Sequence, residues 1–433
     1  MKGHPRSRAR EVNTAVHEAY YIARLNRLQY ASPIVIQRHQ VERLGEALGH
    51  ARRAIPWYSR SWPSFSGGDP FEVLGSLPVV TKRNIVGRKD ELVLPGSDLV
   101  GEWKNRTSGS SGTPSTFYFD WRAARMGKGS YRFTMLQSGW RPWHRLVADY
   151  TRSPTPRRWY EDLGHMRTIR LWTFEPACES VRRLGEFRPH TLYQLPSHLQ
   201  LISQEIISQG VRFDLRAVCT NGETLFDSQR ALIEEAFGVA PRDQYGSAEF
   251  PRIAWECEEG VYHVLPELVV EILDDVGEPV GEGERGRVVC TDIYNRVMPL
   301  IRYDTGDLAV RGPGGCRCGR TLPTLLSVEG KEDDFLVTRD GELVTPRALD
   351  GSLASTQEIL MYEAHQRHPG RLTLKLVMAR PGLDPELLPG IKVFRDGLGR
   401  RFDVEVKVVD DLPLPGSGKR KTVVNQIPVP QAP

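Results

Sequence analysis

The chain has 433 residues, of which 39% are hydrophobic and 26% are charged, so it can form two to three globular domains and is not disordered as a whole. Its net charge of +4 suits an anionic small-molecule ligand and is too weak and dispersed to indicate a nucleic-acid partner. No run approaches the roughly 18 apolar residues of a membrane span. The N-terminus has no apolar segment of a secretory signal, and the six cysteines show no disulfide-framework spacing, so we expect a cytoplasmic protein without a membrane partner.

The first part of the chain is expected to be helical and to lead into a loop rich in hydroxyl groups. Apolar positions predict a helical stretch from about Glu11 to Ala54, and Thr81 is a candidate cap for a short helix. Residues 106–115 read RTSGSSGTPS and precede an aromatic segment typical of a strand. Glycine permits positive φ, so the N–H groups and hydroxyls of this loop can surround a phosphate. Its composition fits a flexible hairpin equally well.

The middle and the end of the chain alternate between predicted strands and helices. Helices are expected from Trp121 to Trp143, at 198–210 and at 228–237, and strands at 146–150, 191–197, 215–220, 268–273, 286–293 and 308–310. The alternation before residue 260 favours βαβ units and a largely parallel sheet, and the later part is β-rich. A boundary is expected near residues 327–334. Beyond it we expect a small unit with a hairpin turn at Arg339-Asp340-Gly341 and strands at 372–377 and 404–409.

Four polar segments follow predicted strands or lie in glycine-rich loops. Asn221-Gly222-Glu223 comes directly after a strand, where parallel sheets place their ligand crevices. Tyr245-Gly246-Ser247-Ala248-Glu249 offers a stacking ring and a hard carboxylate for Mg²⁺. Arg302-Tyr303-Asp304-Thr305-Gly306-Asp307 puts a carboxylate on a tight Thr-Gly turn, where it can accept hydrogen bonds from both ribose hydroxyls. Lys419 lies in a glycine-rich loop. Taken singly, each segment is also explained as a surface charge, a core aromatic, an ordinary turn or a basic tail.

The order of these motifs, continued by Gly330-Lys331-Glu332-Asp333-Asp334, resembles the adenylate-forming superfamily from end to end. More narrowly, it is similar to the phenylacetate–CoA ligase branch, which includes coenzyme F390 synthetase and CapK-type proteins; the segments Leu77–Lys82, Tyr193–Ser197 and Cys318–Pro323 fit that branch. The resemblance covers roughly Leu77 to Lys419. It implies an α/β protein with a large N-terminal domain of mixed and parallel sheets, helices and a β-rich section (residues 1–330), and a small mobile α+β C-terminal domain (residues 331–433).

The resemblance also implies functions for individual residues. The loop that holds the ATP phosphates would consist of Thr107, Ser108, Gly109, Ser110, Ser111, Gly112 and Thr113. The adenine pocket would be lined by Gly222, Glu223, Tyr245, Gly246 and Ser247, and Asp307 would bind ribose. Glu249 would bind Mg²⁺, Asp333 would be the hinge of the C-terminal domain, and Lys419 would promote adenylation. Lys331 stands where an arginine is usual in the family, so its nucleotide contact would lack the planar guanidinium.

Cys257, His263, Cys316 and Cys318 offer a Cys₃His set for a structural Zn²⁺. The spacing is not Cys-x-x-Cys, and similar metal clusters in the resembled family strengthen the prediction. The alternative is a buried thiol, a strand histidine and two cysteines in a solvent-exposed loop.

The resulting functional expectation is an enzyme that uses ATP and Mg²⁺ to convert a carboxylic acid to acyl-AMP, with release of pyrophosphate, and transfers the acyl group to coenzyme A. The candidates for the acid pocket are Trp140, Tyr150, Tyr193, Pro196 and Ser197. The aromatic residues Trp140, Trp143 and Tyr150 suggest an aromatic or unsaturated acid, although they fit a hydrophobic core as well. One alternative transfers the acyl group to an amine, a hydrazine-like nitrogen, a hydroxyl or a carrier-protein thiol. Another is a non-catalytic nucleotide-binding protein. A monomer or a homodimer is expected.

Overall fold

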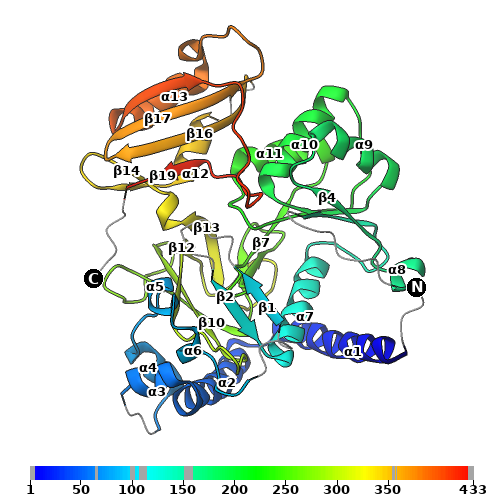
Figure 1. Ribbon diagram of the computed structural model, residues 1–433, viewed down its shortest axis with the longest axis vertical. Coiled ribbons are helices and arrows are strands. Elements are labelled where there is room, and N and C mark those ends of the chain that lie inside the picture. The colour runs from blue at the N-terminus through cyan, green and yellow to red at the C-terminus, as the bar shows by residue number, and fades with distance from the viewer. Residues whose placement is uncertain are drawn as a thin grey trace. The chain divides into compact units, whose positions relative to one another are not determined.

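The computed structural model describes residues 5–63, 67–97, 103–106, 115–150, 159–353, 356 and 358–427. Two compact units divide the chain, and each combines two stretches of sequence: Met1–Gly139 with Gln244–Val328, and Trp140–Asp243 with Glu329–Pro433. Figure 1 shows their elements with the labels used below. Among the described helices, none is both long and apolar enough to cross a membrane.

The first unit begins with two long helices rather than the single helical stretch that the periodicity predicts. α1 (Pro5–Leu28) ends before Ser32, and α2 (Pro33–Ala54) starts with proline at its first position. Proline lacks an N–H group and disfavours helical geometry in the preceding residue, which explains the break. Thr81 precedes α5 as predicted, and its backbone N–H and hydroxyl donate to Asn84 Oδ1 at 2.7 and 2.8 Å. The remaining described helices are α3 (Pro56–Ser61), α4 (Pro70–Ser76), α5 (Lys82–Ile85), α6 (Lys89–Leu92) and α7 (Trp121–Gln137).

The strands of the first unit confirm the predicted β-rich section. β1 (Trp103–Arg106) and β2 (Thr116–Phe119) form an antiparallel pair. The larger set has the order β10-β11-β12-β13-β9-β8-β7. Its members are β7 (Arg242–Tyr245), β8 (Ala254–Glu256), β9 (Tyr262–Val264), β10 (Leu268–Leu273), β11 (Arg285–Asp292), β12 (Tyr303–Arg311) and β13 (Thr324–Lys331).

The segment from Asp304 to Asp307 does not form the tight turn that its sequence suggested. It lies within β12, where Gly306 has φ +70° and the pairing with β11 shifts register between Arg287 and Val289. Such an irregularity changes the direction in which nearby side chains point. The sequence signal of Thr-Gly therefore marks a distortion inside a strand.

Arg302, directly before β12, fastens three segments of the first unit together. Its side chain is buried, its φ is +51°, and its Nε and Nη2 donate to Glu271 of β10 at 3.0–3.2 Å. Its Nη1 donates to the carbonyls of Gly75 and Leu77 at 2.8 and 2.6 Å. Its own backbone carbonyl accepts from Val80 N–H at 2.8 Å. This one residue thus fixes the 75–80 segment against β10 and against β12, the strand that holds Tyr303 and Asp307.

The second unit contains the parallel sheet that the alternating pattern predicted. Its strands have the order β6-β5-β3-β4, and the neighbouring pairs within this group are parallel. α10 begins at Pro196, two residues before the predicted start, and ends at Gly210, where φ is +65°. The elements are β3 (Leu146–Tyr150), β4 (Thr168–Trp172), β5 (Thr191–Gln194), β6 (Ala217–Asn221), α8 (Trp159–Asp162), α9 (Ala177–Phe187), α10 (Pro196–Gln209) and α11 (Asp227–Phe237).

Residues beyond 331, called the lid below, form a small sheet with helices and their own buried core. The sheet has the order β18-β17-β16-β19. The predicted hairpin turn is confirmed by Gly341, which has φ +89° between β14 and β15. The elements are β14 (Leu336–Val337), β15 (Leu343–Val344), α12 (Pro346–Leu353), β16 (Ile359–His368), β17 (Arg371–Met378), α13 (Pro389–Gly397), β18 (Asp403–Val408) and β19 (Val423–Asn425). Short 3₁₀ turns lie at Glu332–Asp334, Pro385–Leu387 and Leu398–Arg400.

The substitution Arg302→Met should lower the free energy of unfolding by about 3–5 kcal/mol, because it leaves Glu271 and two carbonyls without their buried donor. Urea denaturation measures the loss. The control is Arg401→Met, which breaks the exposed pair between Arg401 and Glu342 and should cost less than about 1 kcal/mol. Equal losses in the two variants would contradict the importance given to Arg302.

Glu267 should make the stability of the protein fall as pH rises. Burial raises the pKa of this carboxyl to about 7, although Arg24 acts in the opposite direction. Between its unfolded pKa of about 4.3 and the folded value, the folded state retains a proton that the unfolded state has released, so unfolding becomes easier as pH increases. Glu267→Gln should remove this contribution to the pH dependence of stability, because glutamine does not titrate. Urea unfolding at several pH values between 4.5 and 8 should give a flatter profile for the variant than for the wild type.

Candidate functional site

In the first unit, Tyr245 and Asp307, two of the predicted nucleotide residues, meet where β7 ends. Tyr245 is the last residue of β7, and its hydroxyl donates to Asp307 Oδ2 of β12 at 2.7 Å. Both side chains are buried. Burial raises the pKa of Tyr245, and the adjacent Asp307 raises it further, so the phenol remains a hydrogen-bond donor. The structure therefore brings the predicted adenine residue and the predicted ribose residue into contact.

Gly246 and Ser247 form the turn that follows Tyr245. A Cβ atom on Gly246 would lie 2.7 Å from the carbonyl oxygen of Pro251, so only glycine fits without a backbone shift. Ser247 N–H donates to the Phe250 carbonyl at 2.8 Å, and Ser247 Oγ accepts from Phe250 N–H at 3.1 Å. The turn is thus closed by its own hydrogen bonds, which fix where Glu249 stands.

Glu249 is half-buried in that turn, and its Oε1 accepts a hydrogen bond from the Tyr303 hydroxyl at 3.2 Å. Burial raises the pKa of Tyr303, and Glu249 raises it further. Mg²⁺ is often held by one or two carboxylates together with substrate phosphates, so a partly accessible carboxylate of this kind fits the ion. The contact with Tyr303 was not predicted, although Tyr303 stands in the same motif as Asp307.

In the second unit, Glu223 joins three segments that the sequence analysis singled out. It follows β6, and its carboxylate accepts from the backbone N–H and the hydroxyl of Ser197, both at 3.0 Å. It also accepts from the backbone N–H of Arg420 at 2.7 Å. Burial raises the pKa of Glu223, while these hydrogen bonds and the nearby Lys419 lower it. The carboxylate predicted for the adenine pocket therefore holds the loop that carries the predicted catalytic lysine.

Lys419 lies next to Gly222 in the second unit. A Cβ atom on Gly222 would be 3.2 Å from Lys419 Nζ, and Gly222 itself has φ +77°. The lysine is exposed. Glycine at this position leaves room for the ammonium group at the carboxyl end of β6, which is where ligand crevices of parallel sheets lie.

The predicted hinge lies between β13 and the lid. Lys331 ends β13 and is exposed, as is Asp333 in the 3₁₀ turn that follows. The neighbouring Asp334 is mostly buried and accepts a hydrogen bond from Lys421 Nζ at 2.6 Å. Burial raises the pKa of Asp334, and Lys421 opposes this shift. The Asp334–Lys421 pair, which links the hinge to the lysine loop, was not predicted.

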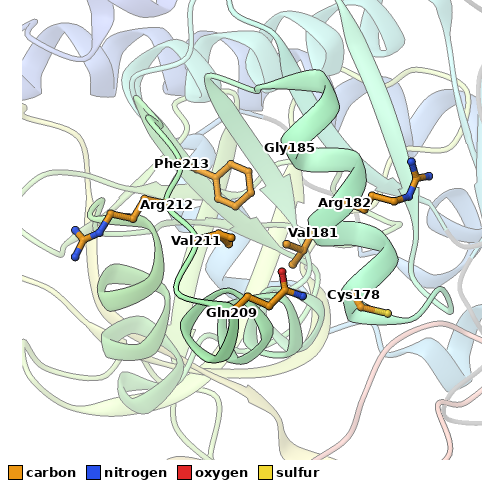
Figure 2. A pocket seen from close by; sticks show the side chains of 8 residues that line it. All are labelled: Cys178, Val181, Arg182, Gly185, Gln209, Val211, Arg212 and Phe213. Atoms are coloured by element: carbon orange, nitrogen blue, oxygen red, sulfur yellow. The ribbon is translucent and has the colours of Figure 1, made fainter.

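The structure says less about the predicted phosphate loop and the predicted acid pocket. The phosphate loop, Thr107 to Thr113, lies outside the described residues, and so does the side chain of Tyr150. In the second unit, Trp140 is buried, Tyr193 of β5 is half-buried, and Pro196 and Ser197 begin α10. A groove of about 450 Å³ between α9 and the end of α10 is lined by Cys178, Arg182, Gln209 and Phe213, among others, and by none of the predicted site residues (Figure 2).

The four predicted zinc ligands come together in the first unit. Cys257 follows β8, His263 lies in β9, and Cys316 and Cys318 lie in the loop between β12 and β13. Their ligand atoms all lie within 4.8 Å of one another. Cys257 Sγ is 3.7 Å from Cys316 Sγ, and Cys318 Sγ is 3.2 Å from His263 Nε2. Two sulfurs on a tetrahedral Zn²⁺ with bonds of about 2.3 Å would be roughly 3.8 Å apart, so this donor set fits the ion.

A neighbour of this cluster, Arg320, was missed. It is buried, and its guanidinium donates to Gln29 Oε1 at 2.9 Å, to Glu258 at 3.0–3.1 Å and to Gln137 Oε1 at 3.1 Å. These contacts tie the cysteine loop to α1 and α7. Two sequence signals could have drawn attention to it: its position two residues after Cys318 and its place in the segment Cys318–Pro323, which fits the resembled branch.

No family model matches the chain, but individual proteins do. It is 26% identical to the phenylacetate–coenzyme A ligase of Pseudomonas putida over 373 residues, which cover 81% of this chain and 83% of that enzyme. It is 32% identical to the Thermus thermophilus phenylacetate–coenzyme A ligase over 217 residues, so that the match spans about half of each protein: 46% of this chain and 48% of the ligase.

Among solved structures, a 2-hydroxyisobutyryl-CoA ligase in the postadenylation state has a TM-score of 0.75 at 19% identity, covering 93% of this chain and 92% of that one. The fold is therefore that of the adenylate-forming CoA ligases. The resemblance of this chain to the phenylacetate–CoA ligase branch of the adenylate-forming superfamily, predicted from its motifs, is confirmed.

Proposed function

We propose that the protein activates a carboxylic acid with ATP as an acyl adenylate, releases pyrophosphate and transfers the acyl group to the thiol of coenzyme A. The observation that supports this most is the position of Lys419 against Gly222, in a loop held by Glu223. The exposed ammonium group of Lys419 lies near the carboxyl end of β6. It is suited to a reaction in which negative charge develops. The Pseudomonas relative is a phenylacetate–coenzyme A ligase, which favours an aromatic acid.

In the first step, an oxygen of the substrate carboxylate attacks the α-phosphorus of ATP, and the bond to pyrophosphate breaks. The Lys419 ammonium stabilises the charge that grows on the phosphate and carboxylate oxygens. Tyr245 and Gly246 receive the adenine, Asp307 the ribose, and the loop from Thr107 to Thr113 the phosphates. Mg²⁺ bound at Glu249 would neutralise part of the phosphate charge. Most of the rate enhancement comes from positioning and charge stabilisation.

In the second step, the coenzyme A thiolate attacks the carbonyl carbon of the acyl adenylate, and AMP leaves. Lys419 has no function there, so the lid turns about Asp333 and removes it. The exposed Asp333, in a short turn between β13 and the lid, suits a hinge. The protein is proposed to act in the cytoplasm as a monomer or a homodimer. Transfer to an amine, a hydrazine-like nitrogen, a hydroxyl or a carrier-protein thiol stays the alternative for this step.

Replacing Lys419 by alanine should lower the rate of ATP–pyrophosphate exchange by about 10²- to 10³-fold, because one charged group that stabilises the transition state is lost. A panel of aromatic and unsaturated acids identifies the substrate first. Lys407→Ala serves as the control, because Lys407 is an exposed lid lysine paired with Glu405. Exchange at the wild-type rate in the Lys419 variant would refute the assignment, and AMP release that depends on an acceptor other than coenzyme A would establish the alternative.

We also infer that Cys257, His263, Cys316 and Cys318 bind one structural Zn²⁺. The ion would fasten the β8–β9 hairpin to the loop between β12 and β13. The inference draws on the fit of the donor distances to a tetrahedral ion, and on the burial of Cys257 and His263.

Metal analysis of the purified protein should find about one zinc per chain, and chelation should lower the melting temperature. Cys318→Ser should reduce zinc content and stability together. Cys178→Ser is the matched control, since Cys178 is exposed on α9 and belongs to the second unit. Zinc-free protein whose melting temperature does not respond to a chelator would exclude the site.

A further inference from the structure

Within the second unit, the lid meets α11 through a buried carboxylate. Asp350 of α12 is only 4% exposed. Its Oδ1 accepts from the Ser228 hydroxyl at 2.6 Å, and its Oδ2 accepts from the Ser228 backbone N–H at 3.3 Å. Ser228 lies in the first turn of α11, so a single residue supplies two donors to one carboxylate. This bidentate contact fixes α12 in both position and orientation.

The third donor to Asp350 comes from the lid itself. The hydroxyl of Tyr362, on β16, donates to Asp350 Oδ1 at 3.2 Å. If the lid turns, Tyr362 turns with Asp350, whereas Ser228 stays with α11. The carboxylate thus keeps one partner in every lid position and gains two more only when the lid lies on α11. Donors to a buried carboxylate form strong, charge-assisted hydrogen bonds, so the two hydrogen bonds from Ser228 favour the docked position.

The neighbouring contacts are weaker than the one at Asp350. Gln200 and Gln204 of α10 donate to the Leu360 carbonyl at 3.3 and 3.2 Å. Arg347 of α12 lies 3.5 Å from Asp227 and 3.6 Å from Glu329. Hydrogen bonds to a charged group are shorter and stronger than those between neutral groups. Asp350 with Ser228 is therefore a short, buried, charged contact between α12 and α11, and it stands beside the contact of Glu223 with Arg420 that holds the lysine loop.

We propose that Asp350 is a positioning residue that, through Ser228, latches the lid in the pose that places Lys419 beside Gly222. The contact does not touch the reacting atoms; it raises the fraction of molecules whose lysine is in place. This inference rests on the proposed function, because it assigns the latched pose to adenylation and the unlatched pose to thioester formation. Loss of one charge-assisted hydrogen bond shifts such an equilibrium by about tenfold.

The variants Ser228→Ala and Asp350→Asn test the latch in the full-length protein. Each should lower ATP–pyrophosphate exchange by about three- to tenfold and leave thioester formation from chemically prepared acyl adenylate and coenzyme A unchanged or faster. The double variant should be no worse than the more affected single one, because both remove the same contact. Asp340→Asn is the control, since Asp340 is a lid carboxylate that accepts from Thr338 in an exposed turn and does not contact α11. It should change neither half-reaction.

A loss of both half-reactions to the same extent would mean that Asp350 only stabilises the fold, and wild-type values for both would mean that there is no latch. Hydrogen–deuterium exchange of the free protein decides the matter even if the wild type performs neither half-reaction, in which case it is the proposed function that fails. Faster exchange in the variants at residues 227–230 and 346–353, with β17 unaffected, supports the latch. Unchanged exchange at those segments overturns it.

Discussion

The carboxylate of Glu223 is the constraint on which the functional part of the second unit depends. A buried carboxylate needs several donors, and here they come from the start of α10 and from the loop after Gly418. The three donors compensate for burial only when strand β6, helix α10 and the lid loop are all in place. Removing the charge of Glu223 from water costs free energy unless all three donors are present. The carboxylate therefore favours the one arrangement of β6, α10 and the lid loop in which they are. Lys419 is placed by this preference, since its own side chain is exposed.

Local patterns predicted the local structure well. Alternation of strand-like and helix-like segments before residue 260 predicted the parallel strands β3, β5 and β6, and Arg339-Asp340-Gly341 predicted the hairpin, because the signals for single segments depend on near neighbours. Pro33 indicates a break between α1 and α2. The break was not predicted because apolar residues continue on both sides of the proline. The irregularity in β12 was interpreted as a turn because Thr-Gly occurs in both settings.

Such local patterns could not predict contacts between residues that are far apart in the sequence. Nothing in the sequence connects Glu223 with Arg420, 197 residues away, or Arg302 with the carbonyls of Gly75 and Leu77. The order of motifs nevertheless identified residues that meet, Tyr245 with Asp307 and Gly222 with Lys419, and the ligand chemistry of cysteine and histidine identified the cluster of Cys257, His263, Cys316 and Cys318. The reason is that members of a family share a three-dimensional arrangement, so a resemblance implies which distant residues meet. Periodicity describes only one helix or strand at a time. Partners such as Tyr303, Asp334 and Asp350, which support the motif residues, became visible only in the structure.

Each unit is composed of two stretches separated by the other unit's sequence. A chain synthesised from its N-terminus cannot complete the first unit until residues 244–328 have left the ribosome, nor the second until the lid has followed. Until those strands have been synthesised, α1 and α2 cannot pack against them, and their apolar surface is exposed to other chains. Arg302 and the cysteine loop, which fasten early segments to late ones, belong to the last part of the first unit to emerge. Because of this order of synthesis, neither unit can complete its core until its second stretch has been made. Overexpression at a high rate should therefore favour aggregation over folding.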